Sequence, residues 1–384
     1  MGIDIIKYCK ENNYRIATTA LETTCQKMEE DYIAKVAYYE QFNQTPETVT
    51  PVAPAEPVAP VVPVTPTEPV TPVIPVVLVT PTIPVAVSGT QGPDIRVGLF
   101  YETALQQVRS THVFNLVDAV GNTLLTVQPN QILTVDFLEN SNQYGYGIGA
   151  VTNQTTQYLR LIPSTDTAVF EIITLDSRPA WNLLLNDNTF LGTLELRHNY
   201  SKNRTWIINE LPVETYLKGI AETSNSSPME YQKTMSVAAR TYASYHLERA
   251  TKHADEYFIV DATYDQVYKG YGTQQRLTQV TEAVEATKGQ IVTYAEEVAI
   301  TPYFSWSDGH TRSMLEVWSV DKPWLQSVVE PAGYDKTTLY GHGVGLSAHG
   351  ALHLANDYNY TYDQILKYYY TGVDITANYN NLFN

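Results

Sequence analysis

Four segments in the second half of the chain combine polar side chains with small residues, as a binding or catalytic site would. They are residues 209–222, 238–242, 265–270 and 341–347. In the second segment, Arg240 follows two alanines inside an apolar stretch. A guanidinium buried there needs a carboxylate or carbonyl partner. Arg240 is therefore predicted to hold Glu222 or a substrate oxygen, or else to tie a helix to a sheet.

The third segment places several hydrogen-bonding side chains on an expected loop. Asp265, Gln266 and Tyr268 carry polar groups that suit the recognition of sugar hydroxyls. The alternative is turn chemistry around Gly270 and Gly272, because glycine accepts backbone angles that other residues avoid. The sequence leaves both interpretations open.

The fourth segment has glycines at alternate positions, Gly341, Gly343 and Gly345. Such spacing permits a close approach of the backbone to a ligand, or a tight bend. The G-x-G-x-x-G order and the strand–turn–helix setting of a nucleotide site are missing, so no cofactor is predicted. His342 lies in this bend, where its ring either contacts a substrate or is satisfied by the backbone.

The histidines and hydroxyls near the fourth segment do not form another recognised catalytic motif. Ser347 lies close to His342 in sequence but lacks the nucleophile elbow of a serine hydrolase. His349 and His353 are four residues apart, which places both on one face of a helix. A third ligand cannot be assigned, and the chain beyond Cys25 has no cysteine, so no metal site is predicted.

The hydrophobic pattern predicts short strands in the first part of the region that begins at residue 94. Residues 95–101 alternate as a strand does, and residues 113–127 read as two strands joined by a turn at Gly121 and Asn122. Similar strands continue to about residue 196. This part is expected to be rich in β-structure.

Helical spacing follows the strands. It covers residues 214–221, 228–249 and 362–370, with Pro228 suited to the first turn of the second helix. Strands return at residues 290–307. Strands and helices do not alternate regularly, so we predict an α+β fold rather than repeated βαβ units.

The N-terminal quarter of the chain differs in composition from the rest. Apolar residues recur at helical spacing within residues 3–44, which predicts an amphipathic helix, alone or paired with another chain. Prolines then occupy every third position from Pro51 to Pro75. This period matches a polyproline II helix, and at ~3.1 Å per residue the stretch to Pro84 would span roughly 100 Å. It is expected to be a stalk or an inert spacer.

These boundaries divide the chain into five parts. The predicted parts are a helical segment at 1–45, a Pro/Val/Thr-rich linker at 46–93, a β-rich portion at 94–191, a mixed portion at 192–376 and a tail at 377–384.

Composition narrows the class of partner. The net charge is −17, from 41 acidic and 24 basic residues, which argues against nucleic acid and anionic lipid as partners. The 29 tyrosines suit either stacking on sugar rings or a β-rich core. No apolar run of about 18 residues predicts a transmembrane helix. The N-terminus also lacks the basic and apolar regions of a signal peptide.

Five motifs occur in an order that resembles the SpoIID/LytB family, the stage II sporulation protein D and amidase enhancer group. They are N-E-L-P-x-E-x-Y-L-x-G at 209–219, A-A-R-T-Y at 238–242, D-Q-x-Y-x-G at 265–270, H-G-x-G-x-S with G-A at 342–351, and Y-Y-x-G at 369–372. Residues 305–311 stand where the family has S-x-S-G-G-x-T. The order of five motifs is far more specific than any one of them.

The resemblance implies lytic transglycosylase activity on peptidoglycan glycan from which the stem peptides have been removed. Glu222 matches the acidic residue of the family, and partial burial would let one carboxylic acid serve first as acid and then as base. The alternative is that Glu222 pairs with Arg240 or caps the helix after Pro228, and Glu214 is expected to be structural. The expected substrate contacts are Arg240, Asp265, Gln266, Tyr268, Ser305, Ser307, Thr311, His342 and Ser347.

The chain also departs from the family pattern. The loop before Glu222 is shorter than in the sporulation branch, Ser227 replaces a tryptophan, and Asp308 replaces a glycine. These departures favour a second interpretation, a glycan-binding module that stimulates a partner amidase without cutting. Either interpretation predicts that the protein works at the cell wall, outside the cytoplasm.

Overall fold

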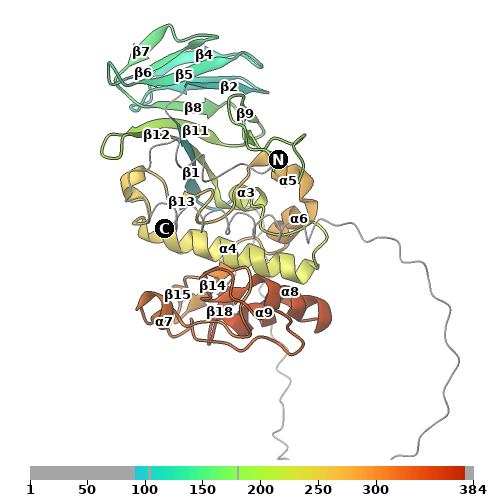
Figure 1. The fold of residues 1–384 in the computed structure, drawn as a ribbon. Helices are drawn as coiled ribbons and strands as arrows, with labels where there is room; N and C mark the ends of the chain where they lie inside the picture. The colour runs from blue at the N-terminus through green and yellow to red at the C-terminus, as the bar shows by residue number, and fades with distance from the viewer. Residues whose placement is uncertain (1–90, 103–104, 180, 377–384) are drawn as a thin grey trace, which may run out of the picture. The chain divides into compact units, whose positions relative to one another are not determined.

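The computed structural model describes residues 91–102, 105–179 and 181–376, all of which lie in one compact unit (Figure 1). The predicted N-terminal helix, the proline-rich stretch up to residue 90 and the tail at 377–384 lie outside the described residues.

The first sheet has seven strands. They are β1 (Asp94–Glu102), β3 (Phe114–Val117), β4 (Thr123–Val127), β8 (Leu159–Pro163), β11 (Thr193–Asn199), β12 (Arg204–Pro212) and β13 (Val260–Asp261). Their order is β13-β1-β12-β11-β8-β3-β4. The pairs are antiparallel except for β1 with β13, which run parallel. Because β8 pairs with β11, the two predicted portions on either side of residue 192 share this sheet.

The second sheet has six antiparallel strands. They are β2 (Gln106–Ser110), β5 (Leu133–Leu138), β6 (Gln143–Ile148), β7 (Asn153–Thr155), β9 (Phe170–Ile172) and β10 (Thr189–Phe190). Their order is β10-β9-β2-β5-β6-β7.

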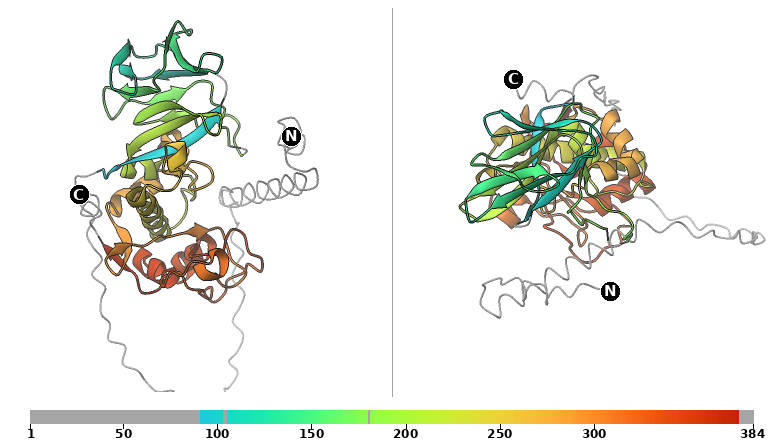
Figure 2. Two further views of the ribbon diagram at one scale, coloured as in Figure 1. Left: turned by 90° about the vertical axis from the view of Figure 1, so that its left-hand side faces the viewer. Right: turned by 90° about the horizontal axis from the view of Figure 1, so that it is seen from above.

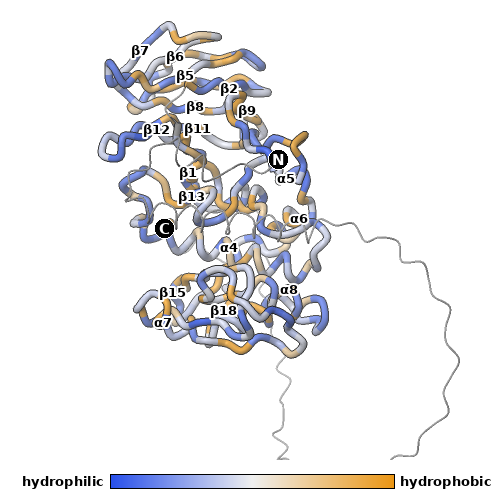
Figure 3. Tube along the Cα trace, viewed as in Figure 1, coloured by the Kyte–Doolittle hydropathy of each residue, from blue (hydrophilic) through white to orange (hydrophobic). Residues whose placement is uncertain are grey.

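One hydrophobic core joins the two sheets. Phe114 of β3 and Phe170 of β9 meet edge to face with ring centroids 5.0 Å apart. Leu116 and Val135, one from each sheet, are buried in the same core. By contrast, the turn between β11 and β12, residues 200–203, is hydrophilic (Figure 3). Alternating side chains therefore hold the sheets together, as the sequence predicted for a β-rich part.

A long helix, α4 (Met229–Arg249), is buried on two sides. Ala239 and Ala243 face the core of the sheets, whereas Tyr231 and Val237 belong to a second core formed with the C-terminal elements. Figure 2 shows α4 between these two groups of elements. Alanine suits this position because its small side chain lets neighbouring elements approach the helix closely.

Shorter helices flank α4. They are α3 (Val213–Lys218), which follows β12 directly, α5 (Tyr271–Arg276) and α6 (Thr278–Ala286). A 3-10 turn, η1 (Ala254–Glu256), lies between α4 and β13.

The C-terminal elements form the other side of α4. The strands are β14 (Ile291–Tyr294), β15 (Glu297–Val298) and β18 (Asp374–Thr376) in one small sheet, and β16 (Tyr303–Phe304) with β17 (Leu346–Ser347) in a parallel pair. The helices are α7 (Met314–Trp318), α8 (Ala348–Asp357) and α9 (Tyr362–Tyr369).

The α+β prediction is confirmed, and so are its longest elements. The predicted helix at 228–249 is α4, with Pro228 as its N-cap rather than in its first turn. Helices α5, α6, α7 and α8 were not predicted. Among the residues that the structure describes, no helix is long and apolar enough to cross a membrane.

Candidate functional site

Glu222 lies on a short stretch that leaves α3 and runs beside residues 267–269. Backbone hydrogen bonds join the two stretches, with Ala221 N–H donating to Val267 O at 2.8 Å and Lys269 N–H to Gly219 O at 2.8 Å. Gly219 is required here, because a Cβ would lie 2.5 Å from the Tyr268 ring. This pairing presents the half-buried Glu222 side chain next to the Val267 amide.

The Glu222 carboxylate is held at both oxygens. Val267 N–H donates to Oε1 at 2.8 Å, and the Tyr303 hydroxyl donates to Oε2. Gln266 Nε2 lies 3.0 Å from the Tyr303 hydroxyl and 3.2 Å from Ala239 O. The hydroxyl of Tyr216, on α3, donates to Gln266 Oε1 at 2.8 Å. We call Tyr216, Gln266, Tyr303 and Glu222 the carboxylate network.

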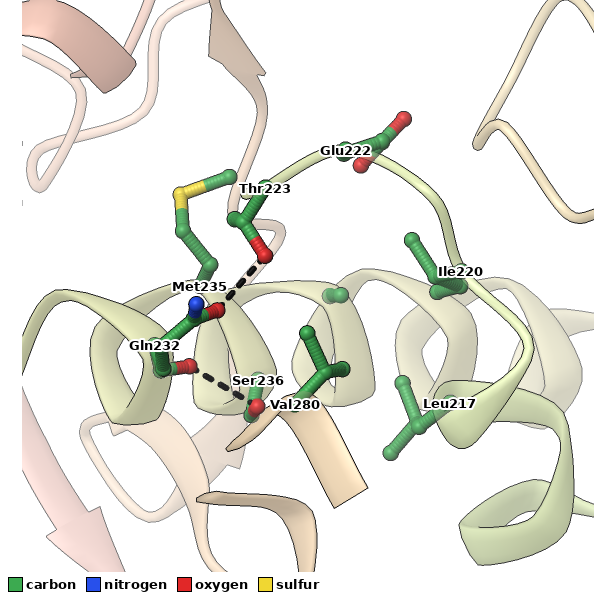
Figure 4. Close-up of a pocket in the computed structure, with 9 residues that line it drawn as sticks. Leu217, Ile220, Glu222, Thr223, Gln232, Met235, Ser236 and Val280 are labelled. Atoms are coloured by element: carbon green, nitrogen blue, oxygen red, sulfur yellow. Dashed lines mark hydrogen bonds between the residues drawn. The ribbon is translucent and has the colours of Figure 1, made fainter. Parts of the chain in front are cut away.

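A small, partly open pocket lies beside Glu222 and next to α4 (Figure 4). Its walls are mainly apolar and include Ile220, Met235 and Val280. At the rim, the Thr223 hydroxyl donates to Gln232 Oε1 at 2.5 Å, which ties the Glu222 loop to α4. The site therefore offers a carboxylate beside an apolar recess.

Arg240 and Glu214 form a fully buried ion pair. The Arg240 Nε and Nη2 atoms donate to the two Glu214 oxygens at 2.8 Å each, and both side chains are 0% exposed. Arg240 also donates to Val284 O at 3.1 Å. The expectation that Arg240 holds Glu222 or a substrate oxygen is therefore wrong. Arg240 instead has a structural role, which joins α4 to helices α3 and α6 rather than to a sheet as the alternative expected, and Glu214 is its partner.

The Asp265 carboxylate is directed into its own loop. It accepts hydrogen bonds from His253 Nε2 at 2.8 Å and from Asp261 N–H at 2.8 Å, and it pairs with Lys252 at 2.6 Å. Burial opposes ionisation of Asp265, but the hydrogen bonds from His253 and Lys252 outweigh it and lower the pKa. Asp265 thus holds residues 252–261 in place, and these contacts lie away from the turn around Gly270 and Gly272.

Gln266 and Tyr268 also point inward. Gln266 is 1% exposed and Tyr268 is 4% exposed. The Tyr268 hydroxyl donates to Asn209 Oδ1 at 2.9 Å, and burial raises the pKa of Tyr268. The structure brings Gln266 to Glu222 through Tyr303, whereas it directs Tyr268 to the sheet. The burial of these two side chains argues against direct contact between either of them and a sugar.

His342 is satisfied by the backbone. Val344 N–H donates to its Nδ1 at 3.0 Å, so in the neutral ring the proton is on Nε2. Burial lowers the pKa of His342 to about 4, and a hydrogen bond with the Tyr303 backbone opposes the shift. The ring packs between Phe304 and Trp318, with centroids 5.6 and 5.0 Å away. His342 therefore supports the strand that carries Tyr303.

Three of the four hydroxyl side chains that were predicted to contact substrate form hydrogen bonds within the protein instead. Ser307 donates to Glu330 Oε1 at 2.7 Å, and Thr311 Oγ1 accepts from Val328 N–H at 2.8 Å. Ser347 caps α8 by accepting from Gly350 N–H at 3.2 Å. All three are 0% exposed. Only Ser305 of this group is half-buried, and its carbonyl accepts from His349 N–H at 2.9 Å.

Two residues of the carboxylate network, Tyr216 and Tyr303, were not among the predicted site residues. Tyr216 lies inside the first motif. Tyr303 lies only two residues before Ser305, and this closeness to a predicted site segment is the sequence signal that could have pointed to it. In the described part of the chain, no group of three or more metal-ligating side chains could hold a metal ion. His349 bonds Asp335 at 2.8 Å instead.

Comparison with known proteins supports the family resemblance. Residues 201–294 match the family model SpoIID, described as Stage II sporulation protein. This range contains Glu222 and Gln266 but ends before Tyr303. The resemblance that the motifs predicted is confirmed over this range.

Several curated proteins are similar to the same part of the chain. An uncharacterized protein of Brachyspira hyodysenteriae is 39% identical over 126 residues, covering 32% of this chain and 33% of that protein. Stage II sporulation protein D of Bacillus subtilis is 30% identical over 137 residues, covering 32% and 40%. The amidase enhancer of Bacillus subtilis is 33% identical over 143 residues, covering 37% and 19%. The chain thus spans less than half of each of these relatives.

Proposed function

We propose that this chain, in which residues 201–294 carry a SpoIID segment, acts on the glycan strands of peptidoglycan as a lytic transglycosylase. The relatives named Stage II sporulation protein D support this class of substrate. Glu222 is the proposed acid and base, because it matches the acidic residue of the family motif. The net charge of −17 agrees with a partner that is not nucleic acid.

In the proposed reaction, protonated Glu222 gives its proton to the oxygen that bridges MurNAc and GlcNAc. The bond between this oxygen and MurNAc C1 breaks, and charge develops on the sugar as in an oxocarbenium ion. The C6 hydroxyl of the same MurNAc then attacks C1, and the Glu222 carboxylate accepts its proton. The products are a 1,6-anhydro end and a free GlcNAc end. No water is consumed, so a second carboxylate is not needed.

The observation that carries this proposal is the position of Glu222 beside the pocket. Arg240, the buried cation of the motif at 238–242, forms an ion pair with Glu214. Glu222 is instead held by an amide and a hydroxyl, Val267 N–H and Tyr303. Two neutral donors stabilise the charged carboxylate less than a buried ion pair with a guanidinium would, so Glu222 can still take up the proton that it gives to the sugar.

The test is digestion of peptide-stripped glycan strands followed by mass spectrometry of the ends. The wild type should produce anhydro-MurNAc ends, and Glu222→Gln should produce none. Glu248→Gln, which changes an exposed carboxylate paired with Arg249, is the matched control and should cleave as the wild type does. If wild type and Glu222→Gln yield the same ends, Glu222 is not the catalytic acid.

A second candidate function is a glycan-binding module that stimulates an amidase. The match to the amidase enhancer favours it. Wild-type protein that sediments with glycan, forms no anhydro ends and accelerates a cell-wall amidase would support this function over the first. Both functions place the protein at the cell wall, outside the cytoplasm, which we propose as its location.

A further inference from the structure

We propose that Tyr303 is a positioning residue for Glu222, and that Gln266 directs the Tyr303 hydroxyl hydrogen onto the Glu222 carboxylate. As a role in catalysis, this inference rests on the proposed function. As a statement about Glu222 in the free protein, it can be tested without any activity.

The direction of the hydrogen bonds follows from which groups can only accept. The carbonyl of Ala239 has no hydrogen to give, and Gln266 Nε2 lies 3.2 Å from it. The amide nitrogen of Gln266 must therefore face this carbonyl. The same nitrogen lies 3.0 Å from the Tyr303 oxygen and donates to it. Tyr303 then has its own hydrogen left for Glu222 Oε2.

The far end of Gln266 is compatible with this orientation. Its Oε1 accepts from the Tyr216 hydroxyl at 2.8 Å. The Tyr216 hydroxyl could also accept from a flipped amide, but the flip would place an oxygen against the Ala239 carbonyl and leave two buried acceptors facing each other. Because Gln266 is 1% exposed, solvent cannot replace the lost partners. Tyr216 therefore donates to Gln266 Oε1, Gln266 Nε2 donates to Tyr303, and Tyr303 donates to Glu222. This arrangement satisfies every group.

Tyr303 remains a donor over the working range of pH. Burial, followed by the negative charge of Glu222, raises the pKa of Tyr303 well above that of a free tyrosine. The same two causes raise the pKa of Tyr216. The other titratable groups whose charges reach Tyr216 are Asp265, Tyr268 and Tyr242. A tyrosine that cannot ionise supplies a hydrogen bond and does not compete with Glu222 as a base.

The strand that carries Tyr303 is fixed from its other side. Tyr303 of β16 pairs in parallel with Leu346 of β17, and Leu346 N–H donates to Pro302 O at 3.1 Å. A Cβ at Gly345 would lie 2.1 Å from the same Pro302 oxygen, so only glycine allows this approach. The glycine-rich segment thus sets the position of Tyr303, and through it the position of one Glu222 oxygen.

The consequence for Glu222 is a carboxylate with a fixed plane and a stabilised negative charge. A neutral donor at each oxygen favours the charged form and makes the proton easier to release. In the proposed reaction, this helps the step in which Glu222 gives its proton to the leaving oxygen. Loss of the Tyr303 hydroxyl should therefore make Glu222 a weaker acid and leave its side chain free to rotate.

The experiment follows the Glu222 carboxyl by ¹³C NMR in full-length protein labelled at the glutamate side chains, with Glu222→Gln used to assign its signal. In Tyr303→Phe the midpoint of the titration should rise by about one pH unit, the usual effect of a lost hydrogen bond to a charged group. Gln266→Met, which leaves the hydroxyl in place but undirected, should shift it in the same direction by less. It also tests the inference if Tyr303→Phe does not fold.

Tyr362→Phe is the matched control, because it removes another tyrosine hydroxyl, one that donates to Gln290 Oε1 at 2.7 Å. It should leave the Glu222 midpoint unchanged. An unchanged midpoint in both Tyr303→Phe and Gln266→Met, or an equal shift in the control, would overturn the inference. If the wild type cleaves glycan, Tyr303→Phe should also lower kcat about tenfold with KM little changed, and move the alkaline limb of the pH profile upward, because Glu222 must be protonated at the start of the reaction. If the wild type does not cleave, the proposed function fails while the titration still decides the role of Tyr303.

Discussion

Replacing Glu214 by alanine should destabilise the folded protein by about 3–5 kcal/mol, the usual cost of breaking a buried ion pair from one side. Arg240 is 0% exposed and gives two hydrogen bonds of 2.8 Å to Glu214. Without Glu214, its remaining hydrogen-bond partners would be neutral, Val284 O at 3.1 Å and Thr287 Oγ1 and Gln290 O at 3.3 Å each. These groups can hydrogen-bond the guanidinium but cannot neutralise it.

The magnitude depends on where the pair lies. Glu214 is in the first turn of α3, and Arg240 is near the middle of α4, so the pair joins the two helices that flank the Glu222 loop. Glu214 Oε1 also accepts from Gly289 N–H at 3.0 Å, which would be left without this acceptor. A buried donor that loses its partner costs about 1–3 kcal/mol, and because this loss is part of the ~3–5 kcal/mol, we expect an effect toward the upper end of that range.

The measurement is urea unfolding of the full chain, followed by circular dichroism at pH 7. A double variant, Glu214→Leu with Arg240→Met, is the control, because replacing both charges by apolar groups leaves no unpaired charge. It should be more stable than Glu214→Ala by at least about 2 kcal/mol. If Glu214→Ala lies within about 1 kcal/mol of the wild type, or if the double variant is the less stable one, the pair does not tie the two helices together.

Three further predictions concern the C-terminal elements. Gly350→Ala should destabilise the protein by about 1–3 kcal/mol in thermal unfolding, because its Cβ would lie 2.0 Å from the Tyr369 hydroxyl and 2.1 Å from Glu330 Oε2. Burial raises the pKa of Glu330, so the folded state binds its proton more tightly than the unfolded state, and the contribution of Glu330 to stability should fall as pH rises through this pKa. Glu330→Gln should therefore gain stability relative to the wild type between pH 4 and pH 7 in urea unfolding, and a constant difference would contradict this assignment. His342 should titrate by NMR near pH 4, because burial lowers its pKa to about 4, and its contribution to stability should be lost as pH falls from about 6.5 toward that value.

The elements that the sequence predicted best are those whose pattern is long and local. Residues 229–249 form a helix, as the helical spacing after Pro228 predicted, and this signal needs no knowledge of the rest of the chain. The turn at Gly121 lies between β3 and β4 as expected. Helix α7 was missed although its start carries a capping box, in which Ser313 and Glu316 bond each other's backbone amides.

The partners of charged side chains were harder to predict, because they are set by contacts far apart in sequence. Arg240 is 26 residues from Glu214, and nothing in the spacing distinguishes Glu214 from Glu222 as its partner. The choice follows from the packing of α3 on α4, which places Glu214 against Arg240 and directs Glu222 toward β16. Tyr303 is 81 residues from Glu222, and its role became visible only when the parallel pairing of β16 with β17 placed its hydroxyl.

The carboxylate network gives a physical reason why the four motif segments occur together. The first segment, 209–222, supplies Tyr216 and Glu222, and the second supplies the Ala239 carbonyl that fixes the amide of Gln266. The third supplies Gln266 itself and the backbone amide that follows it. The fourth pairs with the strand of Tyr303. Each segment thus contributes one fixed point around a single carboxylate, so a change in any of them should be felt at Glu222 even though most of these side chains are too deeply buried to touch a sugar.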